Sequence, residues 1–168
     1  MAKKGTTKYK SNKQEKEVAK LFGGKQVIAS GSLWFADSDV RNDKFLIECK
    51  TTEKDYYSLT AKVWEKIEEE AIRDRWRIPL MIIDLEDKDR LVVFNTKYFE
   101  TQVPEPFDST YNGDSQKSFR VSLKELEEAE KDFGEYIYGR LFIICGKNRN
   151  MLFFMRHKDF VETFKEEL

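Results

Sequence analysis

Short apolar runs separated by polar and charged segments recur along the chain. Most of these runs are rich in β-branched and aromatic residues and are too short for a helix, a pattern typical of buried strands. We therefore expect strands at 26–29, 45–47, 78–85, 91–94, 119–121, 141–145 and 151–155. Only 146–150 separates the last two, so they are expected to form a hairpin.

Longer segments carry apolar residues at helical spacing. The first helix is expected at 12–22, because 12–15 has the form of a capping box and the glycine pair at 23–24 ends a helix readily. A second helix is expected at 59–76, with these glutamates on its solvent-facing side: Glu65, Glu68, Glu69 and Glu70. Shorter helices are expected at 96–100, at 122–132 and from Asp159 onward.

The order of these elements predicts an α/β fold with a mixed central β-sheet flanked by helices. A catalytic core would span about 11–85, and about 86–168 would form a C-terminal α+β elaboration. Neither an internal repeat nor a glycine-rich linker divides the chain, so we expect a single domain at 11–168. Residues 1–10 are expected to form a flexible basic arm.

Charged residues interrupt the strand that begins at Phe45. Glu48 and Lys50 are two residues apart, so both point to one face of the sheet. Asp39 lies just across a hairpin-length connection and is close enough to join them. Two converging carboxylates suit Mg²⁺, and a lysine beside them can position a water or help to deprotonate it. Asp37 competes with Asp39 for the metal, because both face the same side of an extended chain.

Asp39 followed by Glu48-Cys49-Lys50 resembles the signature of the PD-(D/E)XK nuclease superfamily, with Ser38 in place of the proline. The resemblance covers about 11–85 and implies a restriction-endonuclease-like core that hydrolyses DNA phosphodiester bonds. It implies that Asp39, Glu48 and the Cys49 carbonyl hold Mg²⁺, with Mn²⁺ as a substitute, and that Lys50 orients the attacking water. The family pattern of aspartate before valine favours Asp39 over Asp37.

The segment 14–19 is similar to the first helix of archaeal Holliday junction resolvases. The resemblance implies that Glu15 belongs to the active site and reaches the metal directly or through water. The alternative is that Glu15 only caps its own helix. In the same family a serine-glycine loop lies near the scissile phosphate, which implies a DNA contact for Ser30 and Ser32; the alternative is a plain turn.

Charge distribution adds one further candidate for DNA contact. The net charge is −1, so overall charge gives no indication of a nucleic-acid partner. Residues 1–20, however, hold seven lysines against two acids. Lys8, Lys10 and Lys13 are therefore candidates for binding phosphates, and a solubilising tail is the alternative.

The cysteine and histidine content bears on disulfide formation and on the kind of metal site that can be expected. Cys49 and Cys145 each lie in an apolar run, which predicts buried thiols rather than a disulfide. Free thiols are typical of a reducing compartment such as the cytoplasm. The origin of the chain, cellular or from a phage or mobile element, stays open. With His157 as the single histidine, a histidine-based zinc site is not expected. The sequence contains neither an apolar run near 18 residues nor the apolar segment of a secretory signal near its N-terminus.

These observations favour a Mg²⁺-dependent, structure-specific DNA endonuclease of the junction-resolving type, acting as a homodimer on branched DNA. Two alternatives stay open: a sequence-specific endonuclease of the restriction or homing type, and a DNA-binding protein that keeps the fold without catalysis. A plain structural protein with accidental acids is the third, least favoured class.

Overall fold

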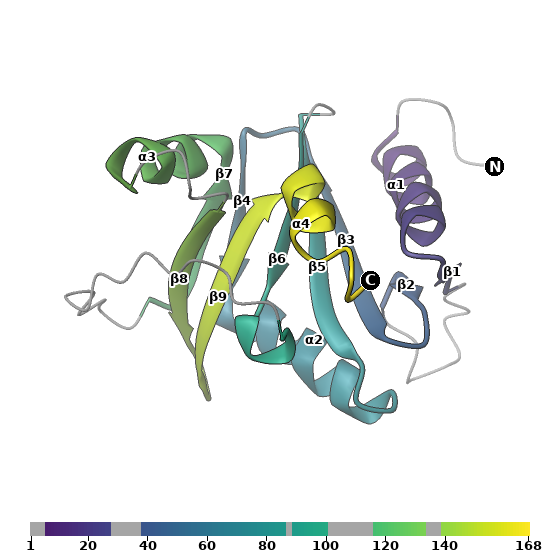
Figure 1. The fold of residues 1–168 in the computed structure, drawn as a ribbon. Helices are drawn as coiled ribbons and strands as arrows, with labels where there is room; N and C mark the ends of the chain where they lie inside the picture. The colour runs from purple at the N-terminus through teal and green to yellow at the C-terminus, as the bar shows by residue number, and fades with distance from the viewer. Residues whose placement is uncertain (1–5, 28–37, 87–88, 101–115, 134–138) are drawn as a thin grey trace.

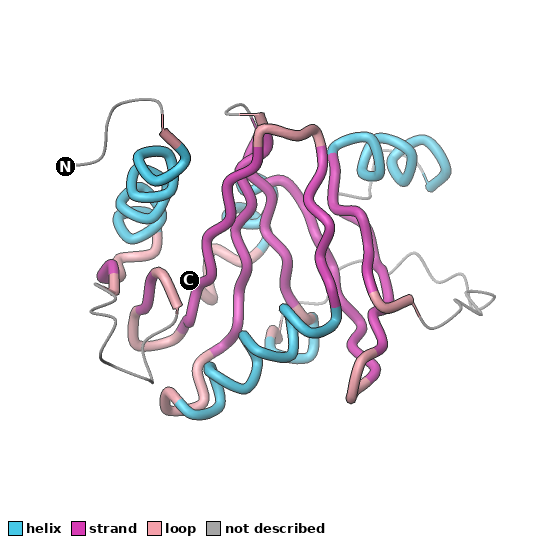
Figure 2. The backbone as a smooth tube through the Cα atoms, turned by 180° about the vertical axis from the view of Figure 1, so that it is seen from behind, coloured by secondary structure: helices cyan, strands magenta, loops and turns pink. Residues whose placement is uncertain are grey.

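The structure, a computed structural model, describes residues 6–27, 38–86, 89–100, 116–133 and 139–168. A seven-stranded sheet forms its centre, with strand order β1-β2-β3-β5-β6-β9-β8. Strands β3 and β5 are parallel and the other neighbours are antiparallel, so the sheet is mixed. Helices lie on both faces of the sheet (Figures 1 and 2). The predicted α/β fold with a mixed central sheet is confirmed.

The strands of the large sheet are β1 (Lys25–Gln26), β2 (Val40–Arg41), β3 (Phe45–Thr52), β5 (Ile78–Leu85), β6 (Asp89–Phe94), β8 (Gly139–Cys145) and β9 (Arg149–Arg156). The helices are α1 (Thr7–Leu21), α2 (Ala61–Arg73), the short 3₁₀ helix η1 (Thr96–Tyr98), α3 (Leu123–Phe133) and α4 (His157–Thr163). Strands β4 (Tyr56–Thr60) and β7 (Ser118–Ser122) form a separate antiparallel pair.

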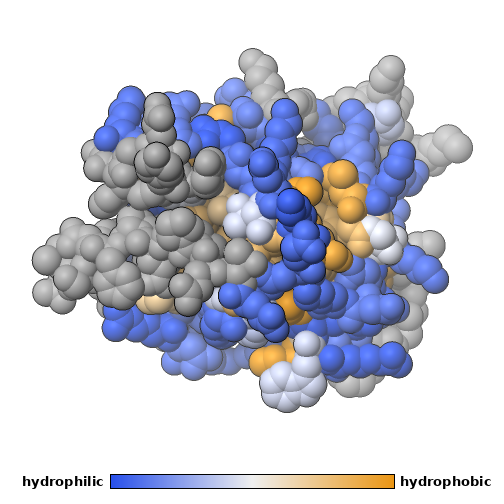
Figure 3. All heavy atoms as spheres, viewed as in Figure 1, coloured by the Kyte–Doolittle hydropathy of each residue, from blue (hydrophilic) through white to orange (hydrophobic). Residues whose placement is uncertain are grey.

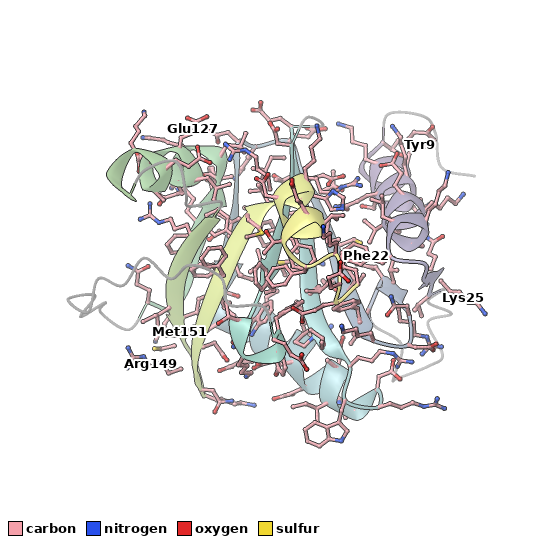
Figure 4. The ribbon with its side chains drawn as sticks, viewed as in Figure 1. Tyr9, Phe22, Lys25, Glu127, Arg149 and Met151 are labelled. Carbon is pink, nitrogen blue, oxygen red and sulfur yellow. The ribbon has the colours of Figure 1, made fainter. Side chains whose placement is uncertain are left out.

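An apolar layer lies on each face of the sheet. On one face, α1 and α4 cover a group of aromatic rings: Phe22, Phe45, Phe94, Phe99, Phe153, Phe160 and Phe164. Phe22, labelled in Figure 4, extends from the end of α1, and its ring contacts those of Phe160 and His157. On the other face, Trp64 and Ile67 of α2 pack with the β4–β7 pair. Both layers are needed because a central sheet buries apolar side chains on both faces.

The predicted strands match the observed ones closely wherever the apolar runs are long. β5 has the predicted bounds, and the β8–β9 hairpin forms as expected. Val40 pairs with Ile47 in the β2–β3 hairpin, which therefore carries Asp39 beside Glu48. Strands β6, β8 and β9 continue the same sheet, so the second half of the chain extends the core sheet.

The first helix begins earlier than predicted. Thr6 caps α1 by accepting a hydrogen bond from the Tyr9 N–H at 3.3 Å, and 7–10 are helical. The expected start at 12 is therefore wrong, and Lys8 and Lys10 belong to the helix rather than to an arm. Threonine is a good N-cap, but the lysine-rich segment after it lacks the apolar spacing on which the prediction relied.

The second helix is shorter than predicted, and the prediction that its glutamates face solvent is wrong for Glu65, Glu68 and Glu70, the last with a side chain 13% exposed. Thr60 caps α2 and Arg73 is its last residue. Glu65 and Glu68 are only 9% and 7% exposed. Glu65 accepts a hydrogen bond from the Asn148 N–H at 2.9 Å, and Glu68 accepts one from Lys97 at 2.8 Å. These partners come from the second half of the chain, which helical periodicity cannot reveal.

Two smaller differences concern short elements. Residues 56–60 form strand β4, where the apolar pattern predicts no strand. The last helix begins at His157, two residues before the predicted start at Asp159, and its Phe160 and the following Phe164 face the core.

The described surface is mainly polar. On the face seen in Figure 3, hydrophobic side chains reach the surface in small areas among hydrophilic ones. Within the described ranges, none of the helices has the length and apolar character needed to cross a membrane.

Candidate active site

The candidate site lies where β2 ends and β3 continues with β5 as its only strand partner among the described residues. The pairing of Val40 with Ile47 continues to Asp39 beside Glu48, one position past the end of β2. Glu48 and Lys50 share the sheet face that α2 covers, because their β5 partners Met81 and Ile83 pack on that face. Helix α1 packs on the opposite face. Side chains from both helices can therefore approach this edge.

Asp39 is anchored by the strand beside it. Its Oδ2 accepts a hydrogen bond from the Cys49 N–H at 2.7 Å. Burial raises the pKa of Asp39, the Cys49 hydrogen bond opposes that rise, and the negative charge of Glu15 adds to it. The carboxylate is thus fixed in position but carries an unfavourable charge that a cation would stabilise.

Glu48 and Lys50 form an ion pair, with 2.5 Å between Lys50 Nζ and Glu48 Oε1. Burial raises the pKa of Glu48, and the charge of Asp39 raises it further, while Lys50 opposes both. Burial alone would lower the pKa of Lys50, but its hydrogen bond and attraction to Glu48 outweigh that effect and raise it. Lys50 is therefore held as a cation.

The carbonyl of Cys49 faces the same edge as Asp39. The N–H and C=O of a strand residue point to the same side, and the Cys49 N–H points to Asp39. Every second carbonyl of a strand points to the same side, so the carbonyls of Phe45 and Cys49 share a direction. The Phe45 carbonyl accepts a hydrogen bond from the Asn42 N–H in the β2–β3 turn, which places this direction on the β2 side. Since β2 begins at Val40, the Cys49 carbonyl points past the end of that strand.

The thiols of Cys49 and Cys145 are both free.

Glu15 lies in the middle of α1 and does not cap it. Gln26 Nε2 of β1 donates a hydrogen bond to Glu15 Oε2. Its charge also raises the pKa of Asp39, so the two carboxylates are electrostatic neighbours. The structure therefore brings all four residues, Glu15, Asp39, Glu48 and Lys50, to one edge of the sheet.

Gln14, the neighbour of Glu15, was not predicted as part of the site. Its side chain is 2% exposed. Nε2 donates to the carbonyl oxygens of Lys50 at 3.0 Å and Ile82 at 3.3 Å, and Oε1 accepts from Thr51 Oγ1 at 2.8 Å. One side chain thus fixes α1 to both β3 and β5 and determines where Glu15 lies relative to Lys50.

Glu70 of α2 is a further carboxylate that the sequence did not indicate. Its Oε2 accepts a hydrogen bond from Ser38 Oγ at 2.8 Å, and its Oε1 lies 3.5 Å from Lys66 Nζ. Its charge raises the pKa of both Asp39 and Glu48. Glu70 is therefore close enough to influence both candidate metal ligands and to orient the residue before Asp39.

Tyr57 approaches the site from β4. Burial raises the pKa of its phenol, the charge of Lys50 opposes this, and the charge of Glu48 adds to it. The phenol is a neutral donor near the ion pair, contributed by a strand that the sequence pattern did not predict.

The remaining predicted residues are dispersed. Lys8 and Lys13 are exposed on α1, and Lys13 lies 3.8 Å from Glu17. Lys10 lies 3.3 Å from Glu53, which follows β3. Ser30, Ser32 and Asp37 lie outside the described residues, so their predicted roles stay predictions.

The donor set fits a magnesium ion. Among the described residues, no group of three or more His, Cys, Asp or Glu side chains is arranged to hold a metal by itself. Magnesium commonly binds one or two carboxylates and takes its other ligands from water and substrate phosphates. Asp39, Glu48 and the Cys49 carbonyl provide oxygen donors of this kind, and burial, the main cause of the raised pKa of each carboxyl, deprives the charged form of water that a bound cation would replace.

Comparison with known proteins gives a remote likeness of fold. No family model matches the sequence, and no curated protein matches it. Among solved structures, the chain is similar to Hjc, a Holliday junction resolvase from the archaeal hyperthermophile Archaeoglobus fulgidus. The match has 16% identity and a TM-score of 0.44, and it covers 67% of this chain and 88% of that chain. At such low similarity, the function has to be argued from the residues of this chain.

Proposed function

We propose that this protein is a Mg²⁺-dependent endonuclease that hydrolyses DNA phosphodiester bonds. The observation that carries the proposal is the convergence of Asp39, Glu48 and Lys50 at one sheet edge, with Lys50 paired to Glu48 and Asp39 held by the Cys49 N–H. A stable fold gains little from two half-buried carboxylates with raised pKa, so their presence calls for a functional explanation.

Each residue has a role in this proposal. Asp39, Glu48 and the Cys49 carbonyl would hold the ion, which supplies Lewis acidity and lowers the pKa of a water. Lys50, already cationic, orients the attacking water and stabilises negative charge developing on the phosphate. Glu15 completes the site directly or through water. Gln14 and Glu70 fix the positions of Glu15 and of the segment before Asp39.

Within this class we propose branched DNA as the substrate and a homodimer as the active form. The similarity of 14–19 to the first helix of archaeal junction resolvases supports this choice, and so does the proximity of Glu15 to Asp39. A junction has two strands to cut, and a symmetric dimer offers two equivalent sites.

The test is cleavage of a labelled four-way junction and of linear duplexes made from the same arms, with Mg²⁺ and with chelator. The native protein is compared with Glu48→Gln and with the matched control Glu53→Gln, whose carboxylate is exposed just beyond β3. We expect paired symmetric cuts in the junction alone, lost with chelator and in Glu48→Gln but retained in Glu53→Gln.

Other outcomes discriminate among the alternatives. Cuts at fixed sequences in linear duplex would favour a restriction or homing type of endonuclease. Tight binding of either DNA without any cleavage would favour the non-catalytic DNA-binding protein. Cleavage retained in Glu48→Gln would show that this carboxylate is not the metal ligand.

A further inference from the structure

The turn between α2 and β5 has two unusual features at adjacent residues. Arg75 and Trp76 both adopt positive φ, 61° and 59°. Trp76 is also 78% exposed, more than any other large hydrophobic residue in the described part of the chain. The turn lies at the lower edge of the molecule in Figure 1, where the end of α2 leads into β5.

Folding alone does not explain this turn. A bulky side chain at positive φ is strained, and glycine or asparagine would form the same turn at lower cost. The turn closes α2 through backbone hydrogen bonds from the Trp76 N–H to the Ile72 carbonyl and from the Arg77 N–H to the Ala71 carbonyl. The Arg77 side chain adds a hydrogen bond from Nη1 to the Asp74 carbonyl at 3.0 Å, and the indole of Trp76 takes no part in these contacts. The exposed indole contributes little burial to the fold. A strained residue with an exposed aromatic ring suggests a functional use.

The charge around the indole is positive. The segment Arg73–Arg77 has three arginines and one acid. The acid, Asp74, is engaged by the half-buried Arg77 and lies 3.6 Å from Arg41. Arg73 and Arg75 remain at the surface, and in the described part of the chain no carboxylate pairs with Arg75. Exposed guanidinium groups attract the phosphates of a nucleic acid, and an exposed aromatic ring offers a surface on which a base can stack. Unpaired nucleotides provide both a phosphate and an accessible base face.

The turn is also tied to the candidate active site. Arg41, which contacts Asp74, lies two residues after Asp39 on the same strand face. Glu70, which contacts Ser38, lies in the last turn of α2, and the helix ends three residues later at Arg73. The turn that carries the indole follows directly. The same end of α2 therefore contacts the segment before Asp39 and leads into Trp76.

We propose that Trp76, supported by Arg75, stacks on an unpaired base next to duplex DNA and so selects substrates with exposed bases. This inference rests on the proposed function and adds a substrate-reading surface outside the catalytic residues. Arg75 contributes contact with phosphates, whereas Trp76 contributes preference for unpaired bases.

The test compares binding of two labelled DNAs in the presence of chelator, which prevents cleavage: a plain duplex and the same duplex with a single-stranded gap. The variants are Trp76→Ala, Trp76→Gly and Trp76→Phe. The matched control is Leu21→Ala, which truncates another exposed apolar residue, 53% exposed, on α1. Trp76→Gly is expected to fold at least as stably as the native chain, because glycine adopts positive φ without strain. Loss of binding in it cannot then be ascribed to unfolding.

We expect Trp76→Ala and Trp76→Gly to weaken binding of the gapped DNA about tenfold while leaving duplex binding unchanged. Trp76→Phe should retain most of the preference, and Leu21→Ala all of it. Arg75→Gln should weaken binding of both DNAs by a similar factor.

An unchanged preference in Trp76→Ala, with both DNAs still bound, overturns the inference and leaves the nuclease proposal intact. If the preference is unchanged but a dimer dissociates in Trp76→Ala, the indole is a subunit contact and the inference is likewise wrong. If the native protein binds neither DNA, the inference fails, whereas the proposed function is decided separately by cleavage of the four-way junction with Mg²⁺.

Discussion

At the scale of single residues, the site combines groups that raise each other's free energy. Asp39 and Glu48 are both partly buried, and Glu70 adds a nearby negative charge to both. Lys50 neutralises only part of this charge. Such an arrangement is unfavourable without a cation and becomes favourable when a divalent ion binds.

Removing the charge of Glu70 should lower the pKa of Asp39 and of Glu48, because a neighbouring negative charge disfavours ionisation. Glu70→Gln keeps an oxygen that can accept the Ser38 hydrogen bond. The measurement is an NMR titration of the side-chain carboxyl groups in both proteins. Glu69→Gln, which changes an exposed neighbour on the same helix, serves as the control and should leave both pKa values in place. Equal pKa values in native protein and Glu70→Gln would contradict the geometry of the site.

Gln14→Leu should lower the free energy of unfolding by about 1–3 kcal/mol, because buried backbone carbonyls would lose a hydrogen-bond donor at nearly constant volume. Urea denaturation measures this change. Lys13→Ala, one residue earlier and exposed, should have little effect. If Gln14→Leu were as stable as the native protein, Gln14 would not fix α1 to the sheet.

The residues of the site differ in how far the sequence reveals them. Asp39, Glu48 and Lys50 could be predicted, because strand alternation and hairpin spacing bring them together locally. Gln14 and Glu70 could not, because their contacts join elements about 30 to 70 residues apart in the chain. Only the sheet order and the helix placement create those contacts.

At the scale of elements, α1 and β4 show where periodicity is insufficient. The apolar spacing of α1 begins late, so the sequence placed its start at 12 although Thr6 caps the helix. Strand β4 has no long apolar run and is stabilised by pairing with the distant β7. β5 was predicted with its observed bounds, because a long run buried on both faces is a strong signal by itself.

The position of the N-cap can be tested by two alanine substitutions. Thr6→Ala should reduce the free energy of unfolding by about 0.5–2 kcal/mol, because it removes the acceptor for the Tyr9 N–H. Asn12→Ala should be neutral or slightly stabilising, because Asn12 lies inside the helix, where alanine is the better helix former. Thermal denaturation of both variants and of the native protein measures the two changes in stability. The opposite order of stabilities would place the start of the helix at 12 after all.

At the scale of the whole molecule, the second half of the chain completes both apolar layers of the sheet. Helix α4 begins at His157, whose Nε2 is buried without a hydrogen-bond partner among the described residues. Burial lowers the pKa of His157, the charge of Arg90 lowers it further, and Asp84 partly opposes both effects.

This lowered pKa makes stability depend on pH. Below about pH 6.5 the unfolded chain takes up a proton on this histidine more readily than the folded chain does. The free energy of unfolding should therefore fall as the pH falls below that value, and the fall should be smaller in His157→Gln. Urea denaturation between pH 5 and pH 8 measures both slopes, and the difference between the proteins isolates His157 from the carboxylates. Parallel curves would show that His157 titrates alike in both states.

The most direct test of the account is the initial rate of Mg²⁺-dependent cleavage of branched DNA by native protein, Asp39→Asn and Asp43→Asn. Asparagine at 39 keeps an acceptor for the Cys49 N–H but loses the charge that would bind the metal. Asp43 is exposed in the same hairpin and serves as the control. We predict a loss of about a thousandfold or more in Asp39→Asn, as expected when a metal ligand is removed, and an unchanged rate in Asp43→Asn. Cleavage by Asp39→Asn at the native rate, or no cleavage by the native protein, would contradict the proposed site.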